Sequence, residues 1–421
     1  MGDMSPNLSL KKAWVVCFIA SLFFLFEFIQ LSSFDALNHY IASYFHLNAS
    51  KVSFLGSAFL WGNVLFLLPA GVLLDRYGSR RAMLVSLSVA VLGLLIFAST
   101  SNFFLAFLAR LMTGIGNAFC FVSLVILVSR WFPAKHQAFA MGVLVNMAFV
   151  GGMFAHTPLV MLIQAYGWKT IMWVNVGLGI FILSLIYFIV ENYPAHRAQE
   201  FSKSTSEKGF LNSLKYILTI QNIAAGVYTS CLNLPIMVLC ALWGMQYLQV
   251  VQHLSIYQAS NAVSMIFLGS MIGCPLAGWC SDQWQKRKPI MWIGAMAALV
   301  LTIPLMMSQH VWSMSTLMFI FFLLGCATSA QVLSYPLISE SNPPAYSGRA
   351  CSIASVIIMG GGMLAQMLFG YLLGLHSDIS GQLSVGQFHL AMYLFPVSIF
   401  LAIGAMFLLK ETNCRHLYTE S

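Results

Sequence analysis

Long apolar stretches follow one another through almost the whole of this chain. Only 8% of its 421 residues are charged and 59% are hydrophobic, whereas a soluble domain carries about 25% charged residues. A surface exposed to water cannot be built from this composition, so we predict an integral membrane protein in contact with the lipid bilayer. The nine cysteines form no CxxC pair and no metal-ligand spacing, and we therefore predict neither a cofactor nor a metal site.

The number of apolar stretches sets the number of membrane spans. A helix needs about 20 mainly apolar residues to cross a bilayer, and twelve stretches of the sequence meet this requirement. They are 13–41, 51–75, 82–99, 103–130, 139–163, 169–190, 219–250, 256–280, 289–308, 311–338, 347–374 and 388–410. The sequence therefore predicts an all-α membrane protein with twelve transmembrane helices.

The basic residues indicate how these helices are oriented. Of the 20 Lys and Arg residues, 17 lie at the N-terminus or in every second loop, two lie in the opposite loops, and Arg110 lies inside a span. Because basic residues accumulate in cytoplasmic loops, we expect both termini in the cytoplasm and the protein in the plasma (bacterial inner) membrane. We also expect a monomer. No basic tract carries interleaved aromatic residues, so we predict no nucleic-acid partner.

One long polar segment, 191–218, separates the sixth span from the seventh. It mixes both charges with Pro, Ser and Thr, which is typical of a solvated linker. We therefore expect an N-terminal six-helix bundle (1–190), a cytoplasmic linker (191–218) and a C-terminal six-helix bundle (219–421).

The same pattern of charged residues occurs after the second span of each half. Residues 71–81 read GVLLDRYGSRR and residues 278–288 read GWCSDQWQKRK. Gly71 matches Gly278 and Asp75 matches Asp282, both at an offset of 207 residues (278 − 71 and 282 − 75). Such a repeat is typical of transporters whose two halves are related by an axis along the membrane normal.

The repeated motif and two others resemble those of one family. GVLLDRYGSRR resembles the G-x-L-x-D-R-x-G-R-R loop of the major facilitator superfamily, and GWCSDQWQKRK resembles its weaker second copy. LARLMTGIGNA (108–118) is similar to that family's R-x-x-x-G-x-G pattern in helix four, and AYGWKTIMWVNVGLGI (165–180) resembles the start of its sixth helix. The resemblance implies two pseudo-symmetric bundles and a secondary transporter that works by alternating access, not an enzyme.

The resemblance also implies a cytoplasmic gate. Gly71 would allow close helix approach, and Gly78 would allow a turn with positive φ. In the family, the acid equivalent to Asp75 lies near the start of helix eleven, which here is 347–349. By pseudo-symmetry we expect Asp282 near the start of helix five, at 138–141, and both contacts would hold the cytoplasmic side closed. The predicted gate residues are Gly71, Asp75, Arg76, Gly78, Arg80, Arg81, Asp282 and Arg287.

Three charges lie inside the predicted spans, where charges are energetically costly and usually functional. Glu27 and Asp35 lie in helix one and Arg110 in helix four. An acid beside a movable cation can bind and release a proton as the pair closes and opens, so we predict that these three residues couple transport to protons. The alternative is a fixed structural ion pair between Arg110 and one of the acids. His39 and His156 rank below Glu27 as proton carriers.

Polar side chains on apolar spans are the candidates for a substrate cavity between the two halves. They are Gln30, Asn117, Asn146, Asn233, Trp243, Gln246, Asn261, Gln331, Tyr335 and Gln366. Each could instead join helices by hydrogen bonds. Asn233 precedes Leu234 and Pro235, which predicts a kink in helix seven. The charges lie only in the first half, which suits a ligand with a cationic or zwitterionic end near the acids; an anion held by Arg110 is the alternative.

We therefore predict the uptake of a small polar or zwitterionic solute by proton symport. The alternatives are a proton-coupled drug or metabolite exporter (an antiporter) and a uniporter. Drug antiporters of the family usually carry Gly-Pro-x-x-x-Gly-Gly in helix five, whereas here Gly151 and Gly152 precede Pro158. A receptor is disfavoured because the sequence has no large soluble extension, and a channel because it would not need the duplicated closure motif. A membrane enzyme is disfavoured because the sequence shows no nucleophile elbow or phosphate-binding loop.

Overall fold

The computed structural model describes residues 6–132, 134–194, 218–307, 311–375 and 383–415. The side chains of residues 6–9, 72, 75, 134–139, 307 and 344–349 fall outside this description. All the regular secondary structure in the described ranges is helical. Eleven of the helices are long and apolar enough to cross a membrane, and a twelfth span results if the bent pair of α6 and α7 counts as one. The predicted all-α fold with twelve spans is therefore confirmed.

The first six spans are made of eight helices. They are α1 (Pro6–Tyr44), α2 (Ala49–Tyr77), α3 (Ser79–Ser99), α4 (Phe103–Asn117), α5 (Cys120–Trp131), α6 (Ala134–Phe154), α7 (Thr157–Tyr166) and α8 (Trp168–Ile189). The fourth span continues from α4 into α5. In the fifth span α6 and α7 meet at 40°, directly after Gly151 and Gly152 and before Pro158, where a helix loses backbone hydrogen bonds most easily.

The later spans are more often interrupted. They are formed by α11 (Ile220–Leu232), η2 (Pro235–Trp243), α12 (Gly244–Val251), α13 (Ile256–Trp284), α14 (Lys288–Met307), α15 (Met314–Thr328), η3 (Ser329–Leu333), α16 (Ser334–Glu340), α17 (Pro344–Gly374), α18 (Val385–Met392) and α19 (Leu394–Leu408). Because Pro235 has no N–H to donate, α11 ends before it and η2 continues the span as a π-helix. Helix seven is thus interrupted at Pro235, where the sequence predicted a kink, and the interruption takes the form of a π-helix.

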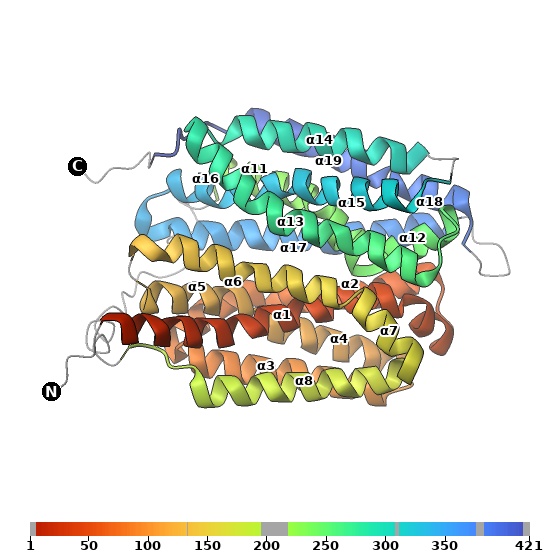
Figure 1. Ribbon diagram of the computed structural model, residues 1–421, viewed down its shortest axis with the longest axis horizontal. Helices are drawn as coiled ribbons and strands as arrows, with labels where there is room; N and C mark the ends of the chain where they lie inside the picture. Colours follow the sequence, from red (N-terminus) through yellow and green to blue (C-terminus); the bar gives the residue numbers. More distant parts are fainter. Residues whose placement is uncertain (1–5, 133, 195–217, 308–310, 376–382, 416–421) are drawn as a thin grey trace.

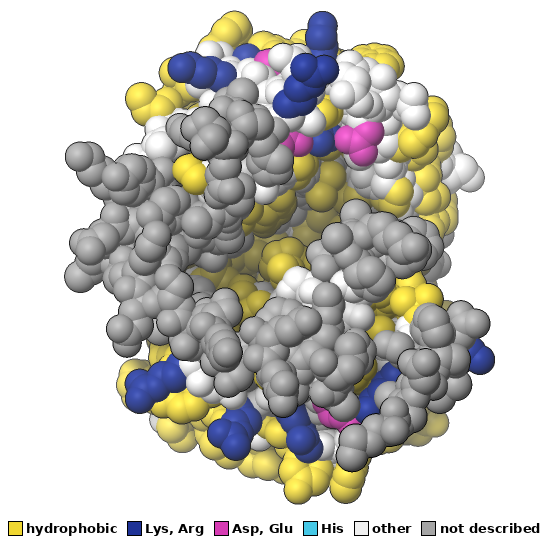
Figure 2. All heavy atoms as spheres, turned by 90° about the vertical axis from the view of Figure 1, so that its left-hand side faces the viewer, with side chains coloured by type: hydrophobic (Ala, Val, Ile, Leu, Met, Phe, Trp, Pro, Cys, Tyr) yellow, Lys and Arg dark blue, Asp and Glu magenta, His cyan; other side chains and the backbone are white. Residues whose placement is uncertain are grey.

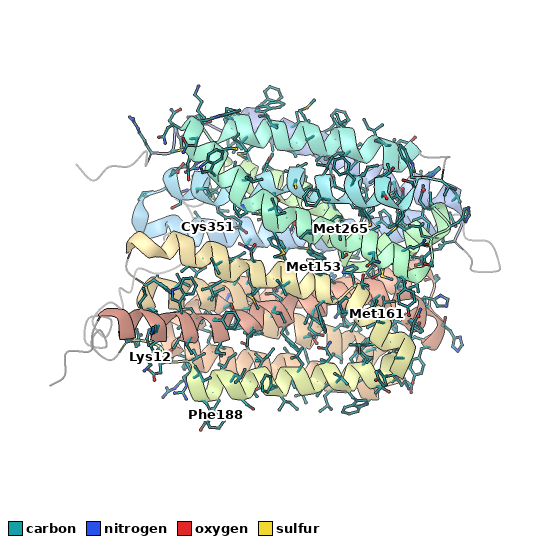
Figure 3. All side chains as sticks on the ribbon, in the orientation of Figure 1. Lys12, Met153, Met161, Phe188, Met265 and Cys351 are labelled. Atoms are coloured by element: carbon teal, nitrogen blue, oxygen red, sulfur yellow. The ribbon has the colours of Figure 1, made fainter. Side chains whose placement is uncertain are left out.

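The helices form two groups that lie one above the other (Figure 1). The lower group contains α1 to α8 and the upper group contains α11 to α19. Where the groups meet, α2 packs along α17, α1 along η2, and α6 along α13. Figure 3 labels Met153 of α6 and Met265 of α13 near this boundary.

Closely packed glycines occur at equivalent places in both groups. A Cβ atom added to Gly114 of α4 would collide with the backbone of Phe59 in α2, and one added to Gly325 of α15 would collide with the backbone of Ile266 in α13. Phe59 and Ile266 are 207 residues apart (266 − 59), the same offset as the repeated charged motif. Small residues at these crossings let the helix backbones touch, so one packing arrangement is used twice.

The two ends of the molecule differ. We call the end at which α1 begins the basic face, because Lys and Arg side chains lie along its upper and lower margins (Figure 2). A hollow lined by hydrophobic side chains opens between these margins. At the opposite end, which we call the closed end, hydrogen bonds join the two groups. They run from Asn38 Nδ2 to the Leu242 carbonyl (2.6 Å), from Trp243 Nε1 to Ser53 Oγ (3.0 Å) and from Thr157 Oγ1 to Asn261 Oδ1 (2.6 Å).

Candidate substrate and proton sites

Arg110 is a buried cation held by aromatic rings. Its guanidinium lies over the rings of Phe34 (4.5 Å) and Phe59 (5.1 Å), and Nη1 donates to the Gln30 carbonyl oxygen at 3.1 Å. Its Nε is buried without a hydrogen-bond partner. Among the described residues, no carboxylate lies within ion-pair distance of Arg110. The structural ion pair with Glu27 or Asp35 that the sequence left open is therefore absent, and ring faces replace the counter-anion only in part.

Glu27 is also buried and incompletely paired. The thiol of Cys120, at the start of α5, forms its side-chain hydrogen bond, while Oε2 has no partner. Three residues before Cys120 lies Asn117, whose side-chain nitrogen and oxygen are both buried and unpartnered. Asn117 follows Arg110 by seven residues, so both lie on one face of α4, about 10 Å apart along its axis. The break between α4 and α5 thus places polar groups without hydrogen-bond partners near the middle of the lower group.

Asp35 lies at the closed end and is paired differently. Its two carboxylate oxygens accept from the backbone N–H of Met245 in α12, at 3.2 Å and 3.1 Å. Oδ2 lies 3.5 Å from Nε2 of His156, and neither side chain is exposed. His156 occupies the bend between α6 and α7, and its Nδ1 lies 2.8 Å from the Gly152 carbonyl oxygen. We ranked His156 low as a proton carrier because a lone histidine in a sequence does not indicate its partner. Gly151, Gly152 and Pro158 were the available signal, since they indicate a break in the helix beside it.

Half of the predicted cavity residues make contacts that join helices. Gln30 Nε2 donates to Asn175 Oδ1 of α8 at 3.1 Å, and Gln366 Nε2 donates to the Met237 carbonyl at 2.6 Å. Trp243 and Asn261 form the hydrogen bonds at the closed end that are described above. The backbone carbonyl of Gln331 accepts from Thr229. For the side chains of Gln30, Trp243, Asn261 and Gln366 these contacts are the packing role that the sequence left open beside substrate binding, whereas Gln331 makes its contact through the backbone.

Two of the predicted cavity amides keep a buried oxygen without a partner. Gln246 Oε1 is buried without a partner, as is Gln366 Oε1. Asn146 of α6 is half-buried, and Asn233 is the residue after α11 at the helix-seven break. Tyr335 of α16 lies 3.5 Å from Ser355 through its hydroxyl and 6.4 Å, ring to ring, from Phe121 of the other group. The unpartnered oxygens of Gln246 and Gln366, together with the side-chain amide of Asn117, are the polar atoms best suited to bind a ligand.

The loop after the second span is partly as predicted. Gly78 ends α2 with φ of +79°, which confirms the positive φ predicted there. The Arg80 backbone N–H donates to Asn192 Oδ1 at 2.8 Å, and its guanidinium donates to the Tyr187 carbonyl oxygen. Arg76 lies 5.4 Å from the centre of the Tyr77 ring, and Arg81 is exposed.

The predicted gate contacts of this loop are only partly visible. A Cβ atom added to Gly71 would meet nothing within 4 Å in the described part of the chain, so the close helix approach expected there stays a prediction for the closed gate. The side chain of Asp75 and those of its predicted partner segment, 347–349, lie outside the described residues.

The second copy of the motif forms a charged cluster within the upper group. Arg287 Nη1 lies 2.7 Å from Asp282 Oδ1, and Nη2 lies 2.7 Å from Glu340 Oε1. Burial disfavours the charge of Arg287, but hydrogen bonds to Glu340 and Asp282 outweigh this and raise its pKa. Asp282 was expected near 138–141, but the side chains of residues 138 and 139 lie outside the described part of the structure. In the described residues Asp282 pairs with Arg287, and the Asp282 side chain is 66% exposed.

Glu411 completes this cluster from the segment after α19. It accepts from the backbone N–H groups of Arg287 (2.9 Å) and Lys288 (2.8 Å). Burial opposes its negative charge, but these and two further backbone N–H donors outweigh burial, so the pKa of Glu411 lies below its ordinary value.

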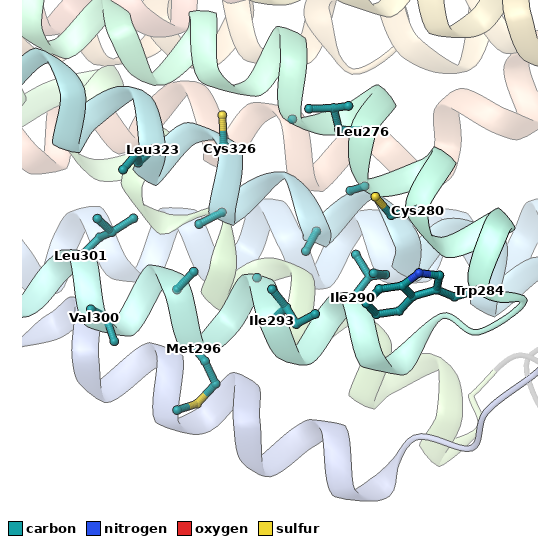
Figure 4. A pocket seen from close by; sticks show the side chains of 16 residues that line it. Leu276, Cys280, Trp284, Ile290, Ile293, Met296, Val300, Leu301, Leu323 and Cys326 are labelled. Carbon is teal, nitrogen blue, oxygen red and sulfur yellow. The ribbon is translucent and has the colours of Figure 1, made fainter.

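A separate groove of about 700 Å³ lies among α13, α14 and α15. Its lining includes Leu276, Trp284, Met296 and Leu323 (Figure 4) and is almost entirely apolar. A polar solute would lose its hydration there without gaining hydrogen bonds. The groove is therefore not the candidate site, which lies with the buried polar groups of α1, α4 and α5.

Comparison with known proteins gives a consistent family. A sequence model described as Major Facilitator Superfamily matches residues 16–365 and 253–415. The probable galactarate/D-glucarate transporter GarP of Escherichia coli is 24% identical over 393 residues, which cover 85% of this chain and 88% of GarP. The D-galactonate transporter of Escherichia coli is 25% identical over 285 residues, which cover 62% of this chain and 65% of that protein.

Other similarities are shorter or structural. The multidrug resistance protein Stp of Mycobacterium tuberculosis is 30% identical over 161 residues, which cover 38% of this chain and only 30% of Stp. A bacterial homolog of the human lysosomal transporter Spinster, in an inward-facing and occupied conformation, superposes with a TM-score of 0.72 at 13% identity, covering 93% of this chain and 96% of that one. A point mutant of the nucleoside transporter NupG also superposes with a TM-score of 0.72, at 12% identity, covering 96% of this chain and 100% of that one.

Proposed function

Since this chain belongs to the Major Facilitator Superfamily, we propose that it takes up a small carboxylate-bearing solute together with protons. The family makes it a multi-pass membrane protein and a secondary transporter rather than an enzyme. We propose further that it works as a monomer in the plasma (bacterial inner) membrane. Residues 1–190 and 219–421 then act as two six-helix bundles joined by the cytoplasmic linker 191–218.

The observation that carries this proposal is the Arg110 guanidinium. It is buried between two aromatic rings and, among the described residues, has no carboxylate partner. A buried charge without a counter-ion is strongly destabilising, and a guanidinium binds a carboxylate with two parallel hydrogen bonds. A substrate carboxylate would therefore supply the missing partner, and the polar atoms of Asn117, Gln246 and Gln366 would bind its hydroxyl groups.

The names of the relatives support the same class of substrate. D-galactonate, galactarate, D-glucarate and sulfoacetate, which these transporters are named for, are all small organic anions at neutral pH. The sequence favoured a cationic or zwitterionic ligand near the acids. The unpaired Arg110 shifts our proposal to an anionic or zwitterionic one whose carboxylate faces α4.

Glu27 is the proposed site of proton coupling. Its buried Oε2 has no hydrogen-bond donor in the described residues, and an uncompensated carboxylate is costly in such a place. We propose that Glu27 carries a proton while the substrate is bound and releases it toward the basic face. Taking the basic face as cytoplasmic by the positive-inside rule, the described conformation is open inward and closed outward.

Purified protein in proteoliposomes tests this function. With the lumen more alkaline than the outside, we expect radiolabelled sugar acids such as D-galactonate to accumulate, and accumulation to stop when a protonophore removes the gradient. Amino acids and nucleosides added to the same vesicles serve as controls for the substrate class. Gradient-independent equilibration would indicate a uniporter, and expulsion of a cationic dye against a proton gradient would indicate an exporter; either result, without sugar-acid accumulation, would overturn the proposal.

A further inference from the structure

We propose that Asp35 and His156 together bind one proton when the closed end is sealed, and that this proton keeps it sealed. The inference rests on the proton coupling proposed above and adds a second proton site, eight residues from Glu27 along α1. It also gives a role to a histidine at the bend of the fifth span.

The hydrogen-bonding capacity of His156 requires the extra proton. A carbonyl oxygen only accepts hydrogen bonds, so Nδ1, 2.8 Å from the Gly152 carbonyl, must carry a hydrogen. In a neutral imidazole the other nitrogen, Nε2, then carries only a lone pair. That nitrogen faces Oδ2 of Asp35 at 3.5 Å. A lone pair facing an ionised carboxylate repels it, whereas a proton on either atom turns the contact into a hydrogen bond.

Burial strengthens this requirement. The side chains of Asp35 and His156 are fully buried, and an ionised carboxylate beside a neutral imidazole would place an uncompensated charge in a low-dielectric interior. With one proton added, the pair is either two neutral groups or a neutral ion pair. The proton comes from the solution outside, binds between Nε2 and Oδ2, and displaces no other group.

The contact with Met245 connects this proton to the closure. Met245 is the second residue of α12, and the first N–H groups of a helix have no acceptor within that helix. Asp35 supplies an acceptor from the other group of helices. His156 is held by the bend between α6 and α7, where its φ and ψ are both −103°. The pair therefore links α1 to the α6–α7 bend, and Asp35 links both to α12, so parting the two groups at this end must break the Asp35–Met245 contact.

No other ionised side chain in the described ranges pairs with Asp35 or His156. The Cys240 thiol on η2 donates to the Val263 carbonyl at 3.9 Å, and the Tyr247 hydroxyl on α12 donates to the Leu305 carbonyl. The Phe267 ring of α13 lies 5.7 Å from His156. The other titratable groups on α1 are Lys11, Lys12, Cys17, Glu27, His39, Tyr40 and Tyr44. Those on the elements packed against the pair include Lys51, Arg110, Cys120, Tyr166, Lys169, Tyr257, Cys274, Cys280 and Asp282.

The direction of the effect follows from these contacts. Loss of the proton leaves the charged Asp35 carboxylate facing the Nε2 lone pair, so we infer that Asp35 turns away from His156 into water and releases the Met245 N–H as the closed end opens. Binding of an external proton restores the contact and seals this end while the basic face opens. This order of events is the one that proton symport into the cell requires.

Hydrogen–deuterium exchange of the first turn of α12 tests the proposal in the intact protein. We compare exchange at about pH 5.5 and about pH 8, on either side of the usual histidine range, after correction for the intrinsic rate. In the wild type we expect exchange at the Met245 amide to be faster at the higher pH by about tenfold, the scale of one hydrogen bond to a charged group. His156→Gln should stay protected at both pH values, because its amide donates to Asp35 without binding a proton.

Two further variants keep the test decisive. His39→Gln makes the same change at an exposed histidine of α1 and should retain the wild-type pH response. Asp35→Asn can accept from Met245 and donate to His156, so it should also be pH-independent, which covers the case that His156→Gln does not fold. Equal protection of the wild type at both pH values, or a wild-type response in both His156→Gln and Asp35→Asn, would overturn the proposal. A normal response without gradient-driven uptake would instead refute only the proposed function.

Discussion

The carboxylate of Asp35 accepts a hydrogen bond from the backbone N–H of Met245, 210 residues farther along the chain. The contact joins α1 to α12, and so joins the two groups of helices at the closed end. A carboxylate that meets the first turn of a helix is favoured both by the N–H donor and by the helix dipole. A side chain of the lower group thereby supplies the hydrogen-bond acceptor that the first turn of a helix in the upper group lacks.

This contact predicts a difference between two substitutions of Asp35. Asp35→Ala removes the acceptor and leaves the Met245 N–H and Nε2 of His156 buried without a partner, so we expect it to lower the stability of the protein by about 1.5–3 kcal/mol. Asp35→Asn keeps an acceptor at the same place and should lose less than half as much. Thermal unfolding of the purified protein in detergent measures both. Equal unfolding temperatures for the two variants would show that the hydrogen bond contributes little.

The repeated glycine crossings predict a matched pair of packing defects. Gly114→Ala would press its Cβ against the backbone of Phe59, and Gly325→Ala would do the same against Ile266. Since neither backbone can rotate away, we expect each substitution to cost about 1–3 kcal/mol of stability. Gly177→Ala in α8 is the control, because its Cβ would meet nothing within 4 Å and alanine favours a helix. Thermal unfolding that left all three variants equal would contradict the account of the packing.

The Glu411 cluster predicts an acid-sensitive contribution to stability. Because the folded-state pKa of Glu411 lies below its ordinary value of 4.5, the stabilisation is fully present above that pH and is lost as the pH falls through the folded-state value. Glu411→Gln should therefore lower the unfolding temperature near neutral pH and reduce the loss of stability on acidification. Glu191→Gln, at an exposed ion pair with Lys12, is the control. A deficit in Glu411→Gln that grew as the pH fell would show that the sign is wrong.

The burial of Glu27 predicts a separation of two transport activities. Glu27→Gln keeps the shape of the side chain but cannot release a proton, so accumulation driven by a pH gradient should stop. Exchange of labelled for unlabelled substrate at equal pH needs no net proton movement and should continue. Both are measured in the same proteoliposomes. Accumulation by this variant would remove Glu27 from the coupling role.

Much of the fold could be predicted from the sequence, because the bilayer imposes its own length scale. The twelve spans follow from runs of about 20 apolar residues. The repeated charged motif placed the loop after the second span, where Gly78 has the positive φ that glycine permits. The interruption at Pro235 was likewise predictable, because a missing N–H acts locally.

The candidate site was less predictable, because it depends on where side chains from distant segments point. The sequence offered Arg110 a partner in Glu27 or Asp35, yet the structure pairs it with the faces of Phe34 and Phe59. The partner of Asp35 is His156, which only the bend between α6 and α7 brings within reach. Distances of this kind follow from tertiary packing, which hydropathy and residue spacing do not encode.

The central claim is that Arg110 binds the carboxylate of the substrate. It is tested most directly by comparing a transported sugar acid with its neutral amide in binding to the wild type and to Arg110→Gln. Isothermal titration should show that the wild type prefers the acid by about 1.5–3 kcal/mol, the contribution of hydrogen bonds to a charged group, and that Arg110→Gln binds acid and amide alike. A variant that kept the full preference for the acid would contradict the claim.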